Sequence, residues 1–94
     1  MRVDIDALWM NWLIAERIKW NKINNVMAEY FFWRSHTRQQ VDFIECNVKG
    51  MEGYKFKYNK KNPLKKPPLF QNHYPDIRVH TVNTGTYFSF LTKK

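Results

Sequence analysis

The sequence predicts a single α/β domain in which one long N-terminal helix accompanies a small mixed sheet. Three observations predict this class. An amphipathic stretch opens the chain, three short strand-like runs separated by turns fill residues 30–58, and a proline-rich segment precedes a fourth alternating run at 77–82. The 94 residues suit one domain spanning 1–94, and an aromatic content of 17% supplies a bulky core.

The N-terminal helix is expected to follow Asp4 or Asp6, either of which can cap it, and to end near Asn21 or Asn24. One broad apolar face would cover the sheet. Glu16 falls in the middle of that face, and its expected partner is Lys19, Arg17 or a backbone amide, because burying an unpaired carboxylate costs several kcal/mol. The covering face consists of Ile5, Leu8, Trp9, Trp12, Leu13, Ala15 and Trp20. Ile14 and Ile18 lie opposite and would contact a second domain or a second subunit.

Residues 30–58 predict an antiparallel meander of three strands. The first strand covers 30–33, a hairpin follows at 35–38, and the second strand covers 39–46. Strict alternation would place Val41 and Phe43 on one face of the second strand. The other face would then carry Gln40, Asp42, Ile44 and Cys46.

The third strand of the meander is expected at 54–58, after a turn bracketed by Gly50 and Gly53. Alternation places Lys55 and Lys57 on one of its faces and Tyr54, Phe56 and Tyr58 on the other. If the register pairs the polar positions of the two strands, the carboxylate of Asp42 and the ammonium groups of Lys55 and Lys57 converge within a side-chain length. The sequence therefore predicts a candidate site on this meander.

Composition changes abruptly at residues 60–68, where three prolines forbid a long regular helix. We expect an extended crossover there, in which Pro67 or Pro68 could open a helical turn that continues to His73. The fourth strand, 77–82, would then join parallel to a neighbour. Residues 87–91 form an aromatic tail that is expected to pack back on the core.

Charge and motif content bound the function. The net charge of +8 favours polyanionic partners, although plain solubility produces the same value. A single cysteine, Cys46, excludes an intrachain disulfide and fits a reducing cytoplasm, and no stretch is long enough to span a membrane. The three histidines lack metal-ligand spacing, so no zinc site is expected. No glycine-rich phosphate loop is present, so no ATPase module is expected in this chain.

Four stretches together resemble a known family. They read ALWMNWLIAERIKWN, YFFWRSHTRQQVDFIE, YKFKYNKK and FQNHYPDIRVHTV, and the resemblance covers about nine tenths of the chain, from Ala7 to Leu91. In this order they resemble the C-terminal domain of unknown function attached to bacterial and archaeal AAA+ ATPases. That domain is similar in fold to the PD-(D/E)XK nucleases, the restriction-endonuclease-like class that includes Holliday junction resolvases. The resemblance implies a three-layer core of that class.

The resemblance also implies a degenerate active site. Nucleases of this class hold Mg²⁺ with an Asp on the second strand and a Glu two residues before a Lys on the third, because a hard dication requires carboxylate oxygens. Asp42 matches the Asp and Lys57 matches the Lys, but Lys55 occupies the position of the Glu. An ammonium group there repels Mg²⁺. Met10 and Gln40 replace two further acidic residues, and Glu16 is the remaining candidate ligand.

We therefore expect a nuclease-like module without catalytic residues, metal or other cofactor. Its expected role is to bind DNA or RNA, or to regulate an AAA+ ATPase domain. The nucleic-acid-binding residues would be Lys55, Lys57, Lys60, Lys61, Lys65 and Lys66, which equally suit a solvated surface. Two alternatives stay open. One is an active Mg²⁺-dependent endonuclease using Asp42, Glu16 and Lys57, and the other is a purely structural interaction domain.

Overall fold

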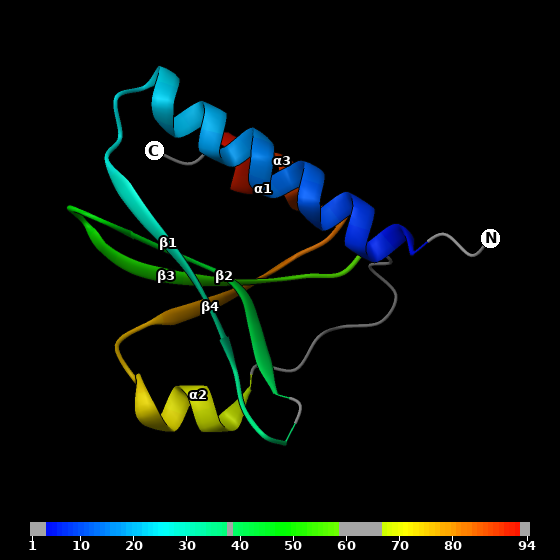
Figure 1. Ribbon diagram of the computed structural model, residues 1–94, viewed down its shortest axis with the longest axis vertical. Coiled ribbons are helices and arrows are strands. Elements are labelled where there is room, and N and C mark those ends of the chain that lie inside the picture. Colours follow the sequence, from blue (N-terminus) through cyan, green and yellow to red (C-terminus); the bar gives the residue numbers. More distant parts are fainter. Residues whose placement is uncertain (1–3, 38, 59–66, 93–94) are drawn as a thin grey trace.

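The computed structural model describes residues 4–37, 39–58 and 67–92 (Figure 1). The elements are α1 (Ile5–Ile23), β1 (Ala28–Arg34), β2 (Gln40–Asn47), β3 (Gly50–Phe56), α2 (Pro68–His73), β4 (Arg78–Val82) and α3 (Tyr87–Thr92). The protein is therefore of the predicted α/β class, with a long N-terminal helix. No helix among the described residues is long and apolar enough to cross a membrane.

The four strands form one mixed sheet in the order β1-β2-β3-β4. β1, β2 and β3 pair antiparallel, as the meander predicted, and β4 joins β3 in parallel. The predicted fourth strand is thus confirmed. Of the connection that carries the chain from β3 to β4, residues 59–66 lie outside the described part, and the rest forms α2 and the turn after it.

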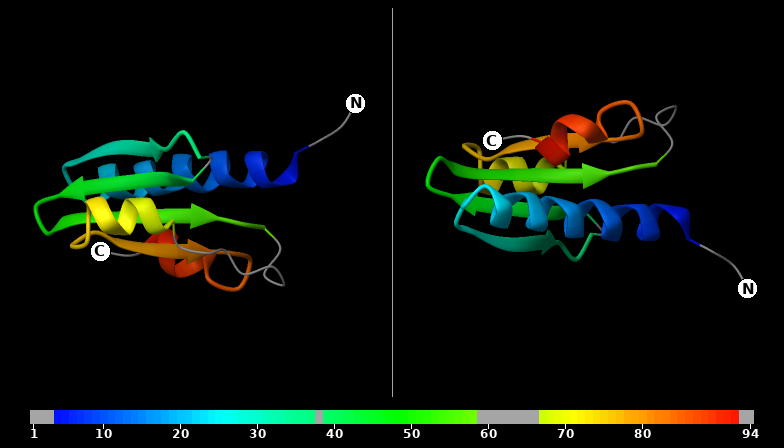
Figure 2. Two further views of the ribbon diagram at one scale, coloured as in Figure 1. Left: turned by 90° about the horizontal axis from the view of Figure 1, so that it is seen from below. Right: turned by 90° about the horizontal axis from the view of Figure 1, so that it is seen from above.

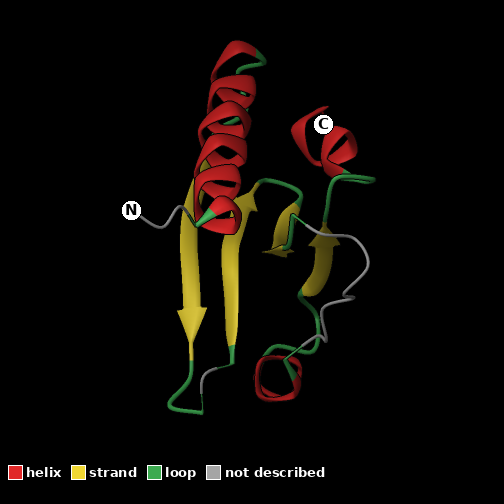
Figure 3. Ribbon diagram, turned by 90° about the vertical axis from the view of Figure 1, so that its right-hand side faces the viewer, coloured by secondary structure: helices red, strands yellow, loops and turns green. Residues whose placement is uncertain are grey.

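Helices cover both faces of the sheet, and each face has its own apolar cluster. Figure 2 and Figure 3 show α1 and α3 on one side and α2 on the other. The first cluster, under α1 and α3, contains Leu13, Phe43, Tyr54, Phe56, Val82 and Phe90. The second, under α2, contains Val41, Ile44, Phe70 and Val79. Burial of Phe90 confirms that the aromatic tail packs back on the core.

The capping residues set the length of α1 as predicted. The Oδ1 atom of Asp4 accepts a hydrogen bond from the backbone N–H of Ala7 at 3.1 Å, which satisfies one of the free donors of the first turn. Asn24 is the C-cap, and Asn25 follows with a φ of 57°, the left-handed conformation that Asn tolerates. The chain then turns directly into β1.

The expected covering face of α1 is wrong in phase. The buried residues of the helix are Leu13, Arg17 and Asn21, which follow one another at intervals of four. Trp9, Met10 and Ile14 pack beside them, so Ile14 faces the core and not a second subunit. Ile5, Leu8 and Trp12 are instead exposed to 53%, 59% and 48%. A polar row fits under the helix because Arg17 and Asn21 have buried partners on the sheet.

The predicted alternation of β2 is also wrong, because the strand contains a β-bulge. Phe31 pairs with Ile44 and Trp33 pairs with Val41, so Asp42 and Phe43 together oppose the single residue between them on β1. As a result Val41 belongs to the cluster under α2, whereas Phe43 belongs to the cluster under α1. One extra residue thus places Val41 and Phe43 on opposite faces of the sheet, whereas strict alternation predicted a common face.

The predicted turn between Gly50 and Gly53 does not exist. Gly50 begins β3 with a φ of 128°, and the hairpin turn precedes it. Gly53 lies inside the strand, where it pairs with Ile44 on one side and Val79 on the other. A Cβ atom at Gly53 would lie 3.0 Å from Cγ1 of Val41, so glycine permits a close approach of packed side chains.

Candidate functional site

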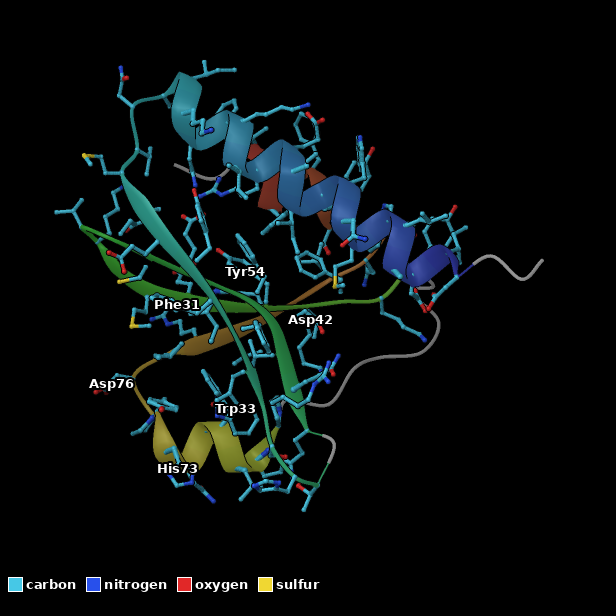
Figure 4. The ribbon with its side chains drawn as sticks, in the orientation of Figure 1. Phe31, Trp33, Asp42, Tyr54, His73 and Asp76 are labelled. Atoms are coloured by element: carbon cyan, nitrogen blue, oxygen red, sulfur yellow. The ribbon has the colours of Figure 1, made fainter. Side chains whose placement is uncertain are left out.

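The structure brings Asp42, Lys55 and Lys57 to one pocket. The pocket has a volume of about 300 Å³ and lies between the start of α1 and the adjoining parts of β2 and β3. It is lined by Asp4, Asp6, Ala7, Met10, Gln40, Asp42, Lys55, Phe56 and Lys57. In Figure 4, Asp42 lies below α1, whereas Trp33 on β1 lies beside α2, where it contacts the ring of Phe70. The bulge in β2 explains how Asp42 comes to lie on the side of α1.

At the end of the β2–β3 ladder, the side chain of Asp42 accepts a hydrogen bond from the backbone of β3, in place of a backbone carbonyl of β2. Its Oδ2 atom accepts a hydrogen bond from the backbone N–H of Phe56 at 2.9 Å, and its Oδ1 atom accepts one from the side-chain amide of Gln40 at 2.7 Å. The regular pairing of the two strands stops one residue earlier, at Phe43 and Tyr54. Both oxygens of this carboxylate are therefore engaged by the protein itself.

Each lysine of the pocket has a partner other than Asp42. Nζ of Lys55 donates to the backbone carbonyl of Gln40 at 2.8 Å. Nζ of Lys57 lies 3.2 Å from Oδ2 of Asp6, in an ion pair whose side chains are 37% and 40% exposed. The polar groups of the pocket thus hold the start of α1 against the end of β3.

Asp6 is a member of this pocket that sequence reasoning assigned only to capping. Its Oδ1 atom accepts from the backbone N–H of Tyr58 at 2.8 Å. This hydrogen bond, with a smaller contribution from Lys57, lowers the pKa of Asp6 below its ordinary value. A usable signal was present, since Asp6 and Met10 are four residues apart and share a helix face.

The pocket does not fit a Mg²⁺ ion. Such an ion needs several free oxygen ligands, but both oxygens of Asp42 and both of Asp6 accept hydrogen bonds from protein groups. The third carboxylate of the pocket, Asp4, uses its Oδ1 atom to cap α1. Among the described residues, no three His, Cys, Asp or Glu side chains are grouped so that they could hold a metal.

The other predicted site residues lie elsewhere. Glu16 does not line the pocket, because it forms an ion pair with Lys19, one turn along α1, at 3.2 Å. This is one of the ordinary partners expected for it. The predicted nucleic-acid-binding residues Lys60, Lys61, Lys65 and Lys66 lie outside the described residues.

A second polar centre, missed by sequence reasoning, lies between α1 and the middle of the sheet. Arg17 and Glu45, each 3% exposed, form a two-point ion pair in which Nε and Nη2 of the guanidinium contact Oε1 and Oε2 at 3.0 Å. Asn21 donates to Oε1 at 2.9 Å, and Asn47 donates to Oε2 at 3.1 Å. The sequence signal was the interval of four that places Arg17 and Asn21 in line with Leu13.

The environment of this centre shifts two ionisable groups. Burial would raise the pKa of Glu45, but hydrogen bonds from Arg17 and Asn21, together with the guanidinium charge, hold it below its ordinary value. Burial raises the pKa of Tyr54, and its hydrogen bond to the carboxylate of Glu52 at 3.0 Å acts in the same direction. Both side chains line an adjoining pocket of about 250 Å³, which also contains Asp76 and Arg78. Opposite charges are mixed in this pocket, so it selects for no single ligand charge.

Comparison of the chain with protein-family models, with curated proteins and with solved structures gave no match.

Proposed function

We propose that this chain is a nucleic-acid-binding module with a nuclease-like fold that does not hydrolyse its ligand. The arrangement of the elements supports this proposal, because a mixed sheet with helices on both faces is compatible with the three-layer core that the resemblance implies. The observation that carries it is the pocket at Asp42, where Lys55 occupies the position expected for a metal-binding Glu and the neighbouring carboxylates are already bound by protein groups.

The distribution of charge also supports a polyanionic partner. The 12 residues from Lys55 to Lys66 contain six lysines and no acidic residue, which gives this stretch a charge of +6, against +8 for the whole chain. A phosphate backbone would be attracted mainly by this short basic stretch.

Fluorescence anisotropy with labelled duplex, single-stranded and four-way-junction DNA, and with RNA, tests the proposal. We expect binding that weakens steeply with salt, because each neutralised phosphate contributes a slope of about −0.9 in a log–log plot for duplex DNA. Replacing Lys60, Lys61, Lys65 and Lys66 by Gln should reduce the slope. Lys19→Gln is a matched control, since this side chain is 67% exposed on α1 and paired with Glu16.

Two results would reject this function. Absence of binding, or binding that does not change with salt, would remove the nucleic-acid partner. Cleavage of DNA in Mg²⁺ or Mn²⁺ that disappears in Asp42→Ala would instead establish the endonuclease alternative.

A second candidate function is that of an interaction domain for an AAA+ ATPase. Ile5, Leu8 and Trp12 form an exposed apolar stripe on α1, and Phe88 on α3 is 68% exposed. A stripe of this kind suits a protein surface more than a phosphate backbone. An ATPase module encoded upstream in the same reading frame would favour this candidate, and Trp12→Gln should then weaken the association between the two domains.

A further inference from the structure

β1 is an open edge of the sheet. Among the described strands it pairs with β2 alone, and Figure 3 shows it at one margin of the sheet. Figure 2 likewise shows β1 outside the strands and helices that form the body of the molecule. A seven-residue strand in this position presents a row of backbone donors and acceptors that no other strand of the sheet uses.

This edge lacks the features that usually prevent two edges from pairing. β1 contains no proline and no lysine, and its charged residues, Glu29 and Arg34, lie near its two ends. The irregularity in its ladder is an extra residue of β2 opposite Phe32, so β1 itself carries no inserted residue. The centre of the strand instead exposes Phe31 to 48% and Phe32 to 74%. The edge is therefore aromatic, and neither proline, lysine nor an inserted residue of its own protects it.

The two exposed rings of β1 lie on opposite faces of the sheet. Tyr30 packs on the cluster under α1, and Trp33 packs on the cluster under α2. Because side chains alternate along a strand, Phe32 shares the face of Tyr30 and Phe31 shares the face of Trp33. Any strand that covered both rings would therefore have to offer apolar side chains on both of its faces.

We propose that a second copy of this chain pairs with β1 through its own β1, antiparallel about a two-fold axis at Phe31. In this register Phe31 lies beside its counterpart, and Tyr30 lies beside Phe32 of the other copy, so each exposed ring meets an aromatic partner. Glu29 then opposes Trp33, and Arg34 opposes Ala28. The strand is complementary to itself over its full length, with no like charges in opposition, and this is why a second copy fits the edge.

Such pairing would join the two sheets into one continuous sheet, without involving the basic residues proposed for nucleic acid. Sedimentation equilibrium should give a mass of twice 11.5 kDa. The double variant Phe31→Lys/Phe32→Lys should weaken the dimer at least tenfold, because lysines on an edge oppose pairing. Phe88→Lys is the matched control, since it places a lysine at an equally exposed ring on α3.

Disulfide cross-linking tests the register without destabilising charges. In a Cys46→Ser background, a cysteine in place of Phe31 would face its counterpart across about 4.5–5.5 Å between Cα atoms, which a disulfide can bridge. A cysteine in place of Glu29 would lie about 14 Å from its counterpart, which no disulfide spans. We expect rapid dimer cross-linking of the first variant and none of the second.

The proposal fails if the wild-type chain stays monomeric up to about 1 mM, the dissociation constant of a very weak complex. It also fails if the dimer survives the double lysine substitution in a folded protein. Equal cross-linking at positions 29 and 31 would likewise overturn it, as would a dimer that Phe88→Lys dissociates.

Discussion

The buried ion pair between Arg17 and Glu45 gives the sharpest test of the structure. In Glu45→Gln the guanidinium keeps its charge but loses its counterion at a site where both side chains are 3% exposed. Breaking a buried pair by removing one partner costs about 3–5 kcal/mol. A stability of about 0.05–0.15 kcal/mol per residue gives roughly 5–14 kcal/mol for a chain of this length. We therefore expect this single exchange to remove a large part of the free energy of unfolding.

Urea unfolding followed by tryptophan fluorescence measures this loss, and a double-mutant cycle identifies its cause. Arg17→Met/Glu45→Leu removes both charges, so its loss of unfolding free energy should be clearly smaller than the losses of Arg17→Met and Glu45→Leu added together. If Glu45→Gln costs less than about 1 kcal/mol, the pair is not buried as described. Additive losses in the cycle would likewise refute the reasoning, because they would show that the two side chains do not interact.

Three further predictions follow from the same contacts. The pKa values of Glu45 and Asp6 are held below their ordinary values, so the stability that they contribute is fully present above the ordinary pKa and should be lost as the pH falls through the folded-state pKa. Urea midpoints measured at decreasing pH check this, and Glu45→Gln should flatten the dependence of the midpoint on pH. Gly53→Ala should lower the melting temperature, with a loss of about 1–3 kcal/mol, because its Cβ would lie 3.0 Å from Cγ1 of Val41, a fully buried β-branched side chain that cannot move aside without displacing the core; a stabilised variant would contradict the packing. Lys57→Met should change the free energy of unfolding by less than about 1 kcal/mol, because the Lys57–Asp6 pair is about 40% exposed, and a larger loss would show that the pair is buried.

The parts of the fold that sequence reasoning predicted depend on local signals. Asp4 marks the start of α1 through its side-chain cap, and Asn24 marks its end. The fourth strand was predicted because alternation resumes after the proline-rich segment. Such signals act within a few residues of the chain, so they can be read without knowledge of the tertiary contacts.

The parts that it missed depend on contacts between distant residues. The helix wheel left Arg17 out of the covering face, because only Glu45, 28 residues away, makes its burial favourable. The bulge at Asp42 leaves only a small mark in the pattern of β2, where Phe43 and Ile44 are adjacent apolar residues. A regular strand with apolar residues on both faces gives the same pattern, so the bulge could not be predicted from it. Convergence of Asp42, Lys55 and Lys57 was predicted from a regular register, whereas Asp6, from the far end of the chain, completes the pocket.

Because of the bulge in β2, the residue that supplies the pocket with its carboxylate, Asp42, can be lost without changing which side chains of β2 face α1 and which face α2. Asp42 is the surplus residue of its strand, so a variant lacking it would keep Val41 under α2 and Phe43 under α1. Loss of a residue from a regular part of the strand, away from the bulge, would instead exchange the layers of everything beyond the deletion. Asp42 is thus an extra residue of its strand, and its loss would leave the layers in place while removing the acceptor of the backbone N–H of Phe56.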